Sequence, residues 1–155
     1  IEKIRTKIPN VAIRTTLLTG FPNETEKDFL ELLDFIKQYQ LDRMGVFTYS
    51  REDGTSAFDL GDPIPQEEKI RRKEAIMLAQ QEVSLEKNKS KVGKIVEVLI
   101  DEKVDGKLFG RTESDAPDID NSVIVNTNRN IPTGAIVNVT ITKAKEYDLY
   151  GKIIN

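Results

Sequence analysis

The residues best placed for ligand chemistry lie on a strand-like run that stops at a tight turn. Residues 11–19 are rich in β-branched side chains, and Gly20 and Pro22 end the run before a capped helix. This strand–turn–helix joint is where α/β proteins commonly bind ligands. Arg14 and Thr16 share one face of the strand, which is unusual for a strand buried on both sides. Arg14 therefore either forms an ion pair within the fold or binds an anionic ligand, because a guanidinium suits a carboxylate.

A second group of polar residues is predicted at the end of the next strand. Tyr49 and Ser50 follow the apolar part of the strand-like residues 44–49, and Thr55 lies in the loop beyond. Loops after the carboxyl ends of barrel strands collect substrate contacts, so these three residues are candidates for substrate binding. For Tyr49, the alternative is packing against the next helix with its hydroxyl group in water.

An acid-rich loop is the third candidate site. Residues 113–120 contain four acids in eight positions, among them Asp115, Asp118 and Asp120. From residue 92 to the end, eight basic residues stand against ten acidic ones. A surface of this sign repels nucleic-acid phosphates and attracts a basic protein. The sequence therefore favours a basic protein partner over RNA, and the alternative is that the acids only keep the loop soluble.

Composition excludes several kinds of chemistry. The 155 residues include no cysteine and no histidine, which removes disulfides, zinc–thiolate sites and the commonest general base. The net charge of −3 does not indicate a polyanionic partner. No apolar run approaches the roughly 18 residues of a membrane span, so no membrane association is expected. The absence of cysteine fits a reducing compartment, and we predict a cytoplasmic protein.

The first half of the sequence predicts a strand–helix–strand unit with parallel pairing. A helix capped at Thr25 should run to about Tyr39, and the spacing from Thr25 to Asp28 resembles a capping box. Glu24 is expected to interact with the dipole of this helix rather than with a cation. A long polar helix should follow over about residues 66–90. Four residues should mark its apolar stripe: Ile70, Met77, Leu78 and Leu85.

A change of pattern predicts a domain boundary at residues 91/92. Five short β-like pieces follow it and predict a small closed all-β barrel: 94–100, 107–111, 122–126, 135–142 and 149–154. Residues 1–91 supply only two strands, which leave open sheet edges. Five of their apolar residues need a larger sheet to be buried: Phe29, Leu33, Ile36, Val46 and Phe47. We therefore expect an α/β partial barrel cut from a longer protein, with self-association through the incomplete sheet.

Three segments resemble one enzyme family, the radical S-adenosylmethionine (SAM) methylthiotransferases. They are, in order, residues 14–26 (RTTLLTGFPNETE), 46–57 (VFTYSREDGTSA) and 110–120 (GRTESDAPDID). The resemblance covers essentially the whole chain and is strongest to the RimO type, which methylthiolates the β-carbon of an aspartate in a small-subunit ribosomal protein. It implies the C-terminal part of a TIM-like radical-SAM barrel in residues 1–91 and an OB-like TRAM domain in residues 92–155. Asn23 stands where the family usually has glycine, and asparagine tolerates a left-handed backbone.

The resemblance also implies cofactors for the complete enzyme, SAM and [4Fe-4S] clusters. SAM would lie across the C-terminal mouth of the barrel, with Arg14 and Thr16 as candidates to contact its carboxylate or ribose. Gly20 would let the backbone approach SAM, because it lacks a Cβ. The cysteines that hold such clusters are missing from this sequence. The chain by itself is therefore expected to bind no metal or cofactor, to be inactive and to carry no catalytic residue.

Two other functions are compatible with the sequence. A related tRNA-adenosine methylthiotransferase would bind RNA through the β barrel, which requires clustered lysine and arginine residues that this region does not have in excess. A free-standing binding module without an attached enzyme is the other alternative. A Cys-x3-Cys-x2-Cys loop encoded ahead of Ile1 would favour the enzyme.

Overall fold

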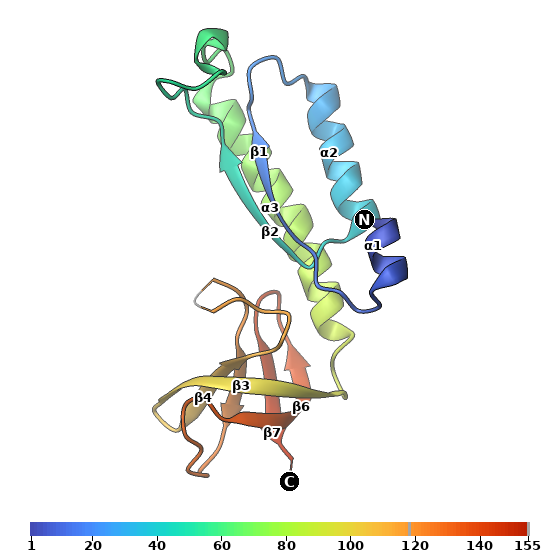
Figure 1. Cartoon of the computed structure of the whole chain (residues 1–155), viewed down its shortest axis with the longest axis vertical. Helices are drawn as coiled ribbons and strands as arrows, with labels where there is room; N and C mark the ends of the chain where they lie inside the picture. The colour runs from blue at the N-terminus through green and yellow to red at the C-terminus, as the bar shows by residue number, and fades with distance from the viewer. Residues whose placement is uncertain (118, 155) are drawn as a thin grey trace. The chain divides into compact units, whose positions relative to one another are not determined.

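Two units make up the part of the chain that the computed structural model describes, residues 1–117 and 119–154. Contacts within the chain group Ile1–Val83 into one unit and Ser84–Asn155 into the other. The border therefore falls inside the longest helix, α3. Helices and strands of the first unit follow one another along the chain (Figure 1): α1 (Glu2–Lys7), β1 (Arg14–Thr19), α2 (Glu26–Tyr39), β2 (Arg43–Thr48), a 3-10 turn (Phe58–Leu60) and most of α3 (Gln66–Lys89).

Strands β1 and β2 form a parallel two-stranded sheet with one covered face. Leu17 pairs with Val46 on this face. Both join an apolar core with residues of α2 and α3: Phe29, Ile36, Ile76, Ala79 and Val83. Odd-numbered positions of β1 are the more buried ones, which confirms the alternation predicted from the sequence. The strand itself begins at Arg14 rather than at Val11.

The other face of this sheet is open. Leu18 of β1 pairs with Phe47 of β2, and they are 48% and 62% exposed. Phe47 therefore agrees with the expectation that a larger sheet is needed to bury it, because both helices that contribute to the core pack on the opposite face. The expectation is wrong for the residues that face these helices. Phe29, Ile36 and Val46 are buried without further sheet, and Leu33 is half-buried. Two strands do not define a barrel, so the partial barrel stays a prediction.

The joint between β1 and α2 has the predicted turn and cap. The Thr25 hydroxyl accepts a hydrogen bond from the backbone N–H of Asp28, while the Asp28 carboxylate accepts one from the N–H of Thr25. This reciprocal pair is a capping box, and it fixes the start of the helix. Asn23 has φ +74°, which confirms that asparagine accommodates the left-handed position in this turn.

Helix α3 buries a different stripe from the one that its apolar residues predict. Ile70 is 44% exposed and Leu78 is 59% exposed, so neither belongs to the buried stripe. The buried positions include five polar residues: Lys69, Arg72, Gln80, Ser84 and Asn88. Each of them has a hydrogen-bond partner, as Gln80 shows by donating to the carbonyl oxygen of Leu41 at 2.9 Å. The predicted stripe is therefore wrong for Ile70 and Leu78, whereas Met77 does pack against the apolar core.

The second unit contains a closed barrel (Figure 1). Its described strands are hydrogen-bonded in the order β3-β4-β5-β7-β6. Their bounds are β3 (Ile95–Val104), β4 (Lys107–Arg111), β5 (Val123–Asn126), β6 (Ile136–Ala144) and β7 (Leu149–Ile153). Only β5 and β7 pair in parallel among these described strands. Aliphatic side chains fill the barrel, among them Ile100, Leu108 and Val139. The predicted small barrel and all five predicted strands are confirmed.

Within residues 1–117 and 119–154, no helix combines the length and the apolar character needed to cross a membrane.

Candidate functional site

The turn after β1 is held in place by the carboxylate of Glu24. One of its oxygens accepts a hydrogen bond from the Thr19 hydroxyl at 3.0 Å, and the other accepts one from the backbone N–H of Gly20 at 3.0 Å. Nη1 of Arg72, on α3, donates to the same carboxylate at 2.6 Å. Glu24 precedes Thr25, the N-cap of α2, and pairs with a cation. The prediction that it serves mainly the helix dipole is wrong.

A buried lysine crosses the same end of the sheet. Lys69 is 1% exposed, and its ammonium group donates to the carbonyl oxygen of Tyr49 at 2.9 Å and to the carboxylate of Asp62. Its side chain runs over Gly20, where an added Cβ would lie 2.5 Å from Lys69 Cγ. Gly20 also has φ +77°, which favours glycine. Packing against Lys69 accounts for this glycine, and its predicted approach to SAM stays a prediction.

An ion-pair network continues from this site along α3. Glu68 accepts from Arg71 Nη2 and from Arg72 Nε, both at 2.7 Å, and Arg71 also reaches Glu26 of α2 at 2.8 Å. Hydrogen bonds from Arg71 and Arg72 lower the pKa of Glu68 from 4.5 to about 2. Burial opposes the charge of Arg72, but hydrogen bonds to Glu24 and Glu68 outweigh it and raise the pKa of Arg72. The network ties the start of α2 to α3.

The three candidates that follow β2 lie in different environments. Tyr49 is buried, its hydroxyl donates to the carbonyl oxygen of Ala57 at 3.1 Å, and its ring meets Phe21 edge-on at 5.3 Å. The alternative in which the Tyr49 hydroxyl stays in water is therefore wrong. Ser50 and Thr55 are exposed; Ser50 donates to the Glu52 side chain, and Thr55 donates to the Glu52 carbonyl oxygen, both at 2.8 Å. Substrate binding by Tyr49, Ser50 and Thr55 stays a prediction.

Arg14 and Thr16 lie on the open face of the β1–β2 sheet. Both are exposed, and the paired strand places Arg43 beside Arg14 and Gly45 beside Thr16. Gly45 has no side chain, so Thr16 stands beside a gap in the row of side chains. The structure thus leaves polar groups accessible on the face that the sequence assigns to a ligand. Contact with SAM through Arg14 or Thr16 stays a prediction.

The acid-rich loop of the second unit uses its carboxylates to hold its own backbone. Asp115 is buried and accepts from the backbone N–H of Thr112 at 3.2 Å and from its hydroxyl at 2.6 Å. Asp120 accepts from the backbone N–H of Ala116 at 2.7 Å. Asp118 lies outside the described residues. The structure gives Asp115 and Asp120 roles within the loop, and their contact with a substrate stays a prediction.

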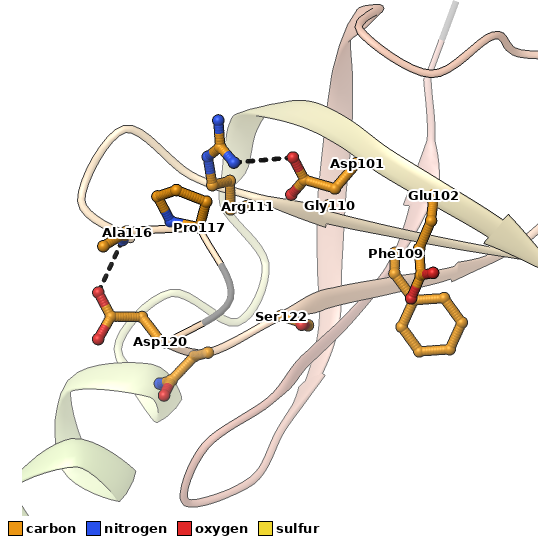
Figure 2. Close-up of a pocket in the computed structure, with 10 residues that line it drawn as sticks. Asp101, Glu102, Phe109, Gly110, Arg111, Ala116, Pro117, Asp120 and Ser122 are labelled. Carbon is orange, nitrogen blue, oxygen red and sulfur yellow. Dashed lines mark hydrogen bonds and ion pairs between the residues drawn. The ribbon is translucent and has the colours of Figure 1, made fainter.

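Beside this loop is a hollow of about 350 Å³ on the barrel surface (Figure 2). Asp101 of β3 pairs there with Arg111 of β4 at 2.8 Å, so Arg111 is tied to a neighbouring strand. Glu102 and Phe109 lie opposite each other on the same two strands. Sequence reasoning missed Asp101, Glu102 and Phe109. The alternation of β4, in which Leu108 points inward, would have placed Phe109 on the outer surface.

The described residues do not fit an iron–sulfur cluster. The sequence has no cysteine, and the described residues contain no group of three or more histidine, cysteine, aspartate or glutamate side chains arranged to hold a metal. No reaction step can therefore be derived through a cluster held by this chain. The first unit offers a hydrogen-bonded strand-end turn and an open sheet face that carries both polar and apolar side chains, and the second offers an acidic hollow.

The closed barrel belongs to a known class. The family model described as TRAM domain matches residues 92–154. That segment begins after α3 and includes all five barrel strands, whereas the contacts also group the last residues of α3 with the barrel. The second unit is therefore a TRAM domain preceded by the end of a helix.

Known relatives cover both units. Proteins named "ribosomal protein uS12 methylthiotransferase RimO" are 45% identical over 157 residues in Pelotomaculum thermopropionicum, 47% over 156 in Microcystis aeruginosa and 46% over 155 in Vibrio cholerae. The alignments cover 99%, 99% and 100% of this chain and 35%, 35% and 33% of the relatives. The chain is thus a relative of the RimO-type methylthiotransferases along nearly its whole length, which confirms the resemblance. It spans about a third of the length of these relatives.

Proposed function

We propose that this chain is the C-terminal part of a RimO-like enzyme, which replaces a hydrogen on the β-carbon of an aspartate in ribosomal protein uS12 with a methylthio group. The observation that carries the proposal is identity of 45–47% along nearly the whole chain to proteins of that name. Catalysis would need cluster cysteines from outside these residues. The chain alone would therefore be inactive.

In this proposal, residues 1–91 are the last strands and helices of a TIM-like radical-SAM barrel and help to close its cofactor chamber. The open face of β1 and β2 supports this role, because it presents Arg14 and Thr16 beside exposed Leu18 and Phe47. SAM, when bound, supplies the methyl group and the radical. Arg14 would orient its carboxylate through paired hydrogen bonds.

The residues around Glu24 and Lys69 would hold the loop after β2 in position to meet the substrate, and they would not take part in the reaction. Lys69 joins the end of β2 to the loop that carries Asp62, and Glu24 fixes the turn after β1. Tyr49 is locked by its own hydrogen bond, so the exposed Ser50 and Thr55 are the side chains of that loop best placed to meet a substrate.

Residues 92–155 would bind the protein substrate. Ribosomal proteins are typically basic, and this region carries a net charge of −2. Asp115 and Asp120 accept hydrogen bonds from backbone N–H groups and so hold the loop, and both acids count towards this net charge. Asp118 would add a further negative charge to the same loop.

One feature favours the alternative, a tRNA-modifying enzyme whose TRAM domain binds RNA. The ammonium groups of Lys143 and Lys145 each lie 5.8 Å from the centre of the Tyr150 ring. Lysines beside an aromatic ring are a common arrangement for binding single-stranded nucleic acid. The acidic loop and the net charge of the region oppose this alternative.

The test is methylthio transfer by the complete enzyme that contains this chain, assembled with iron and sulfide without oxygen and supplied with SAM and a reductant. Purified uS12 and purified tRNA would be offered in parallel, and mass spectrometry would detect the mass gain that results when one hydrogen is replaced by a methylthio group. Modification of an aspartate in uS12 is expected. Modification of tRNA alone would replace the proposal with the alternative.

A further inference from the structure

Asn121 is among the residues that line the hollow of the TRAM domain, and it carries a buried polar atom without a partner. The side-chain nitrogen of Asn121 is inaccessible and makes no hydrogen bond within the part of the chain that the structure describes. Leaving a buried donor unpaired costs about 1–3 kcal/mol, so such groups are rare in native proteins and call for an explanation. A ligand with a carbonyl oxygen would supply the missing acceptor after a small movement of the walls.

The charges around this donor favour a cation in the same hollow. Asp101, Glu102 and Asp120 contribute carboxylates to its lining, against the one guanidinium of Arg111 (Figure 2). Arg111 pairs with Asp101, whereas exposed Glu102 forms no ion pair with any described residue. The lining is therefore negative by about two charges. A lysine or arginine side chain fits this field, and a phosphate does not.

Apolar side chains line the hollow beside the acids. Phe109 and Pro117 line the hollow, and Phe109 pairs across the strands with Ile124, which in turn pairs with Tyr150. All three of these barrel residues are half-buried on the outer surface, because they alternate with the core residues of their strands. This row gives an apolar strip that starts in the hollow and runs across β4, β5 and β7.

We propose that the hollow is the docking site for an extended, basic segment of the protein substrate. A lysine or arginine of the segment places its ammonium or guanidinium beside Glu102 and its methylene groups on Phe109. A backbone carbonyl of the segment accepts from Asn121, and neighbouring apolar side chains lie on Ile124 and Tyr150. The proposal rests on the proposed function, in which the TRAM domain binds uS12, and it moves the main contact from the loop to β3 and β4.

A polypeptide is the occupant that meets all three requirements together. It carries cations, apolar side chains and regularly spaced carbonyl oxygens, and an extended chain can satisfy them within a few residues. Single-stranded RNA also offers carbonyl groups and stacking bases, but its phosphates would meet the carboxylates of the hollow. The volume of about 350 Å³ lies in the range of pockets that enclose small ligands or side chains.

The test measures binding of purified, fluorescently labelled uS12 to this chain and to its variants. Glu102→Lys should weaken binding about tenfold or more, because it reverses the charge that meets the cation. Glu97→Lys is the matched control, since Glu97 is an exposed acid on the same strand outside the hollow, and it should change binding less than about threefold. Equal effects of Glu102→Lys and Glu97→Lys would overturn the proposal.

Asn121→Ala separates binding from a structural role. The unpaired donor costs free energy in the folded chain, so its removal should leave the melting temperature unchanged or higher while weakening uS12 binding several-fold. A lower melting temperature with unchanged binding would show that Asn121 is structural and refute the proposal. Displacement of bound uS12 by oligouridylate, at the same salt concentration, would equally refute it in favour of RNA.

The two proposals fail differently. If the complete enzyme does not modify uS12 although Glu102→Lys weakens binding and Glu97→Lys does not, the proposed function is wrong and the docking site stands. If uS12 is modified but Glu102→Lys binds it as well as Glu97→Lys does, the docking site is wrong and the proposed function stands.

Discussion

Gly20→Ala should destabilise the first unit through two separate physical effects. Gly20 has φ +77°, and placing a residue with a Cβ in the left-handed region costs roughly 1–2 kcal/mol. The new Cβ would also lie 2.5 Å from Lys69 Cγ, and overpacking of this kind typically costs about 1–3 kcal/mol. The expected loss in the free energy of unfolding is therefore about 2–5 kcal/mol.

Gly54→Ala is the matched control for this substitution. Gly54 has φ +76°, but an added Cβ would meet no atom within 4 Å, so only the backbone cost of about 1–2 kcal/mol applies. Urea unfolding would be followed by the helical circular-dichroism signal, because the described helices lie within residues 2–89. The reasoning is refuted if Gly20→Ala costs no more than Gly54→Ala.

A double-mutant cycle then tests whether the Lys69 side chain is what excludes a Cβ at Gly20. In a Lys69→Ala background, most of the packing part of the Gly20→Ala cost should disappear, because Cγ and Cδ are removed while Cβ stays at 3.3 Å. The backbone part of about 1–2 kcal/mol should remain. Lys69→Ala is itself destabilising because the carbonyl of Tyr49 loses its donor, and the cycle subtracts that effect. An unchanged cost of Gly20→Ala in this background would show that Lys69 is not what excludes a side chain at Gly20.

Three further outcomes follow from the first unit. Thr25→Ala should lower the unfolding free energy by about 1 kcal/mol, whereas Thr25→Ser should retain most of it, as thermal melts would show. Arg71 and Arg72 lower the pKa of Glu68 to about 2, so its stabilising effect is complete above pH 4.5 and is lost as the pH falls towards 2. The variant Glu68→Gln should therefore flatten that part of the curve of unfolding free energy against pH. Phe47→Ser should reduce self-association in sedimentation experiments, because Phe47 is 62% exposed on the open sheet face; equal association of both proteins would contradict this.

The elements of this chain were largely predictable because local rules decide them. The Thr25 to Asp28 capping box marks the start of α2, and β-branched runs between turn residues mark the barrel strands. The strand predicted over residues 107–111 coincides with β4. The short helix α1 was not predicted, since it buries no residue and so leaves no apolar periodicity in the sequence.

The inner face of α3 could not be predicted from an apolar pattern. Lys69 and Arg72 occupy positions that would be apolar in an ordinary amphipathic helix. Their partners lie outside the helix, Asp62 seven residues before Lys69 and Glu24 48 residues before Arg72. A hydropathy pattern assigns such charged residues to the solvent. The predicted stripe therefore included the apolar Ile70 and Leu78, which are exposed in the structure. Buried ion pairs between distant segments depend on tertiary structure and leave no periodic signal.

The charge of the TRAM domain was predictable, but the availability of its carboxylates was not. Composition fixes the sign of the field, because residues 92–155 contain ten acidic and eight basic residues. Geometry decides which carboxylate can approach a cation, and it leaves Glu102 exposed beside Phe109 while Asp115 is buried in its own loop. A charge reversal at Asp115 would therefore disturb the loop and the field at once, whereas one at Glu102 changes the field alone.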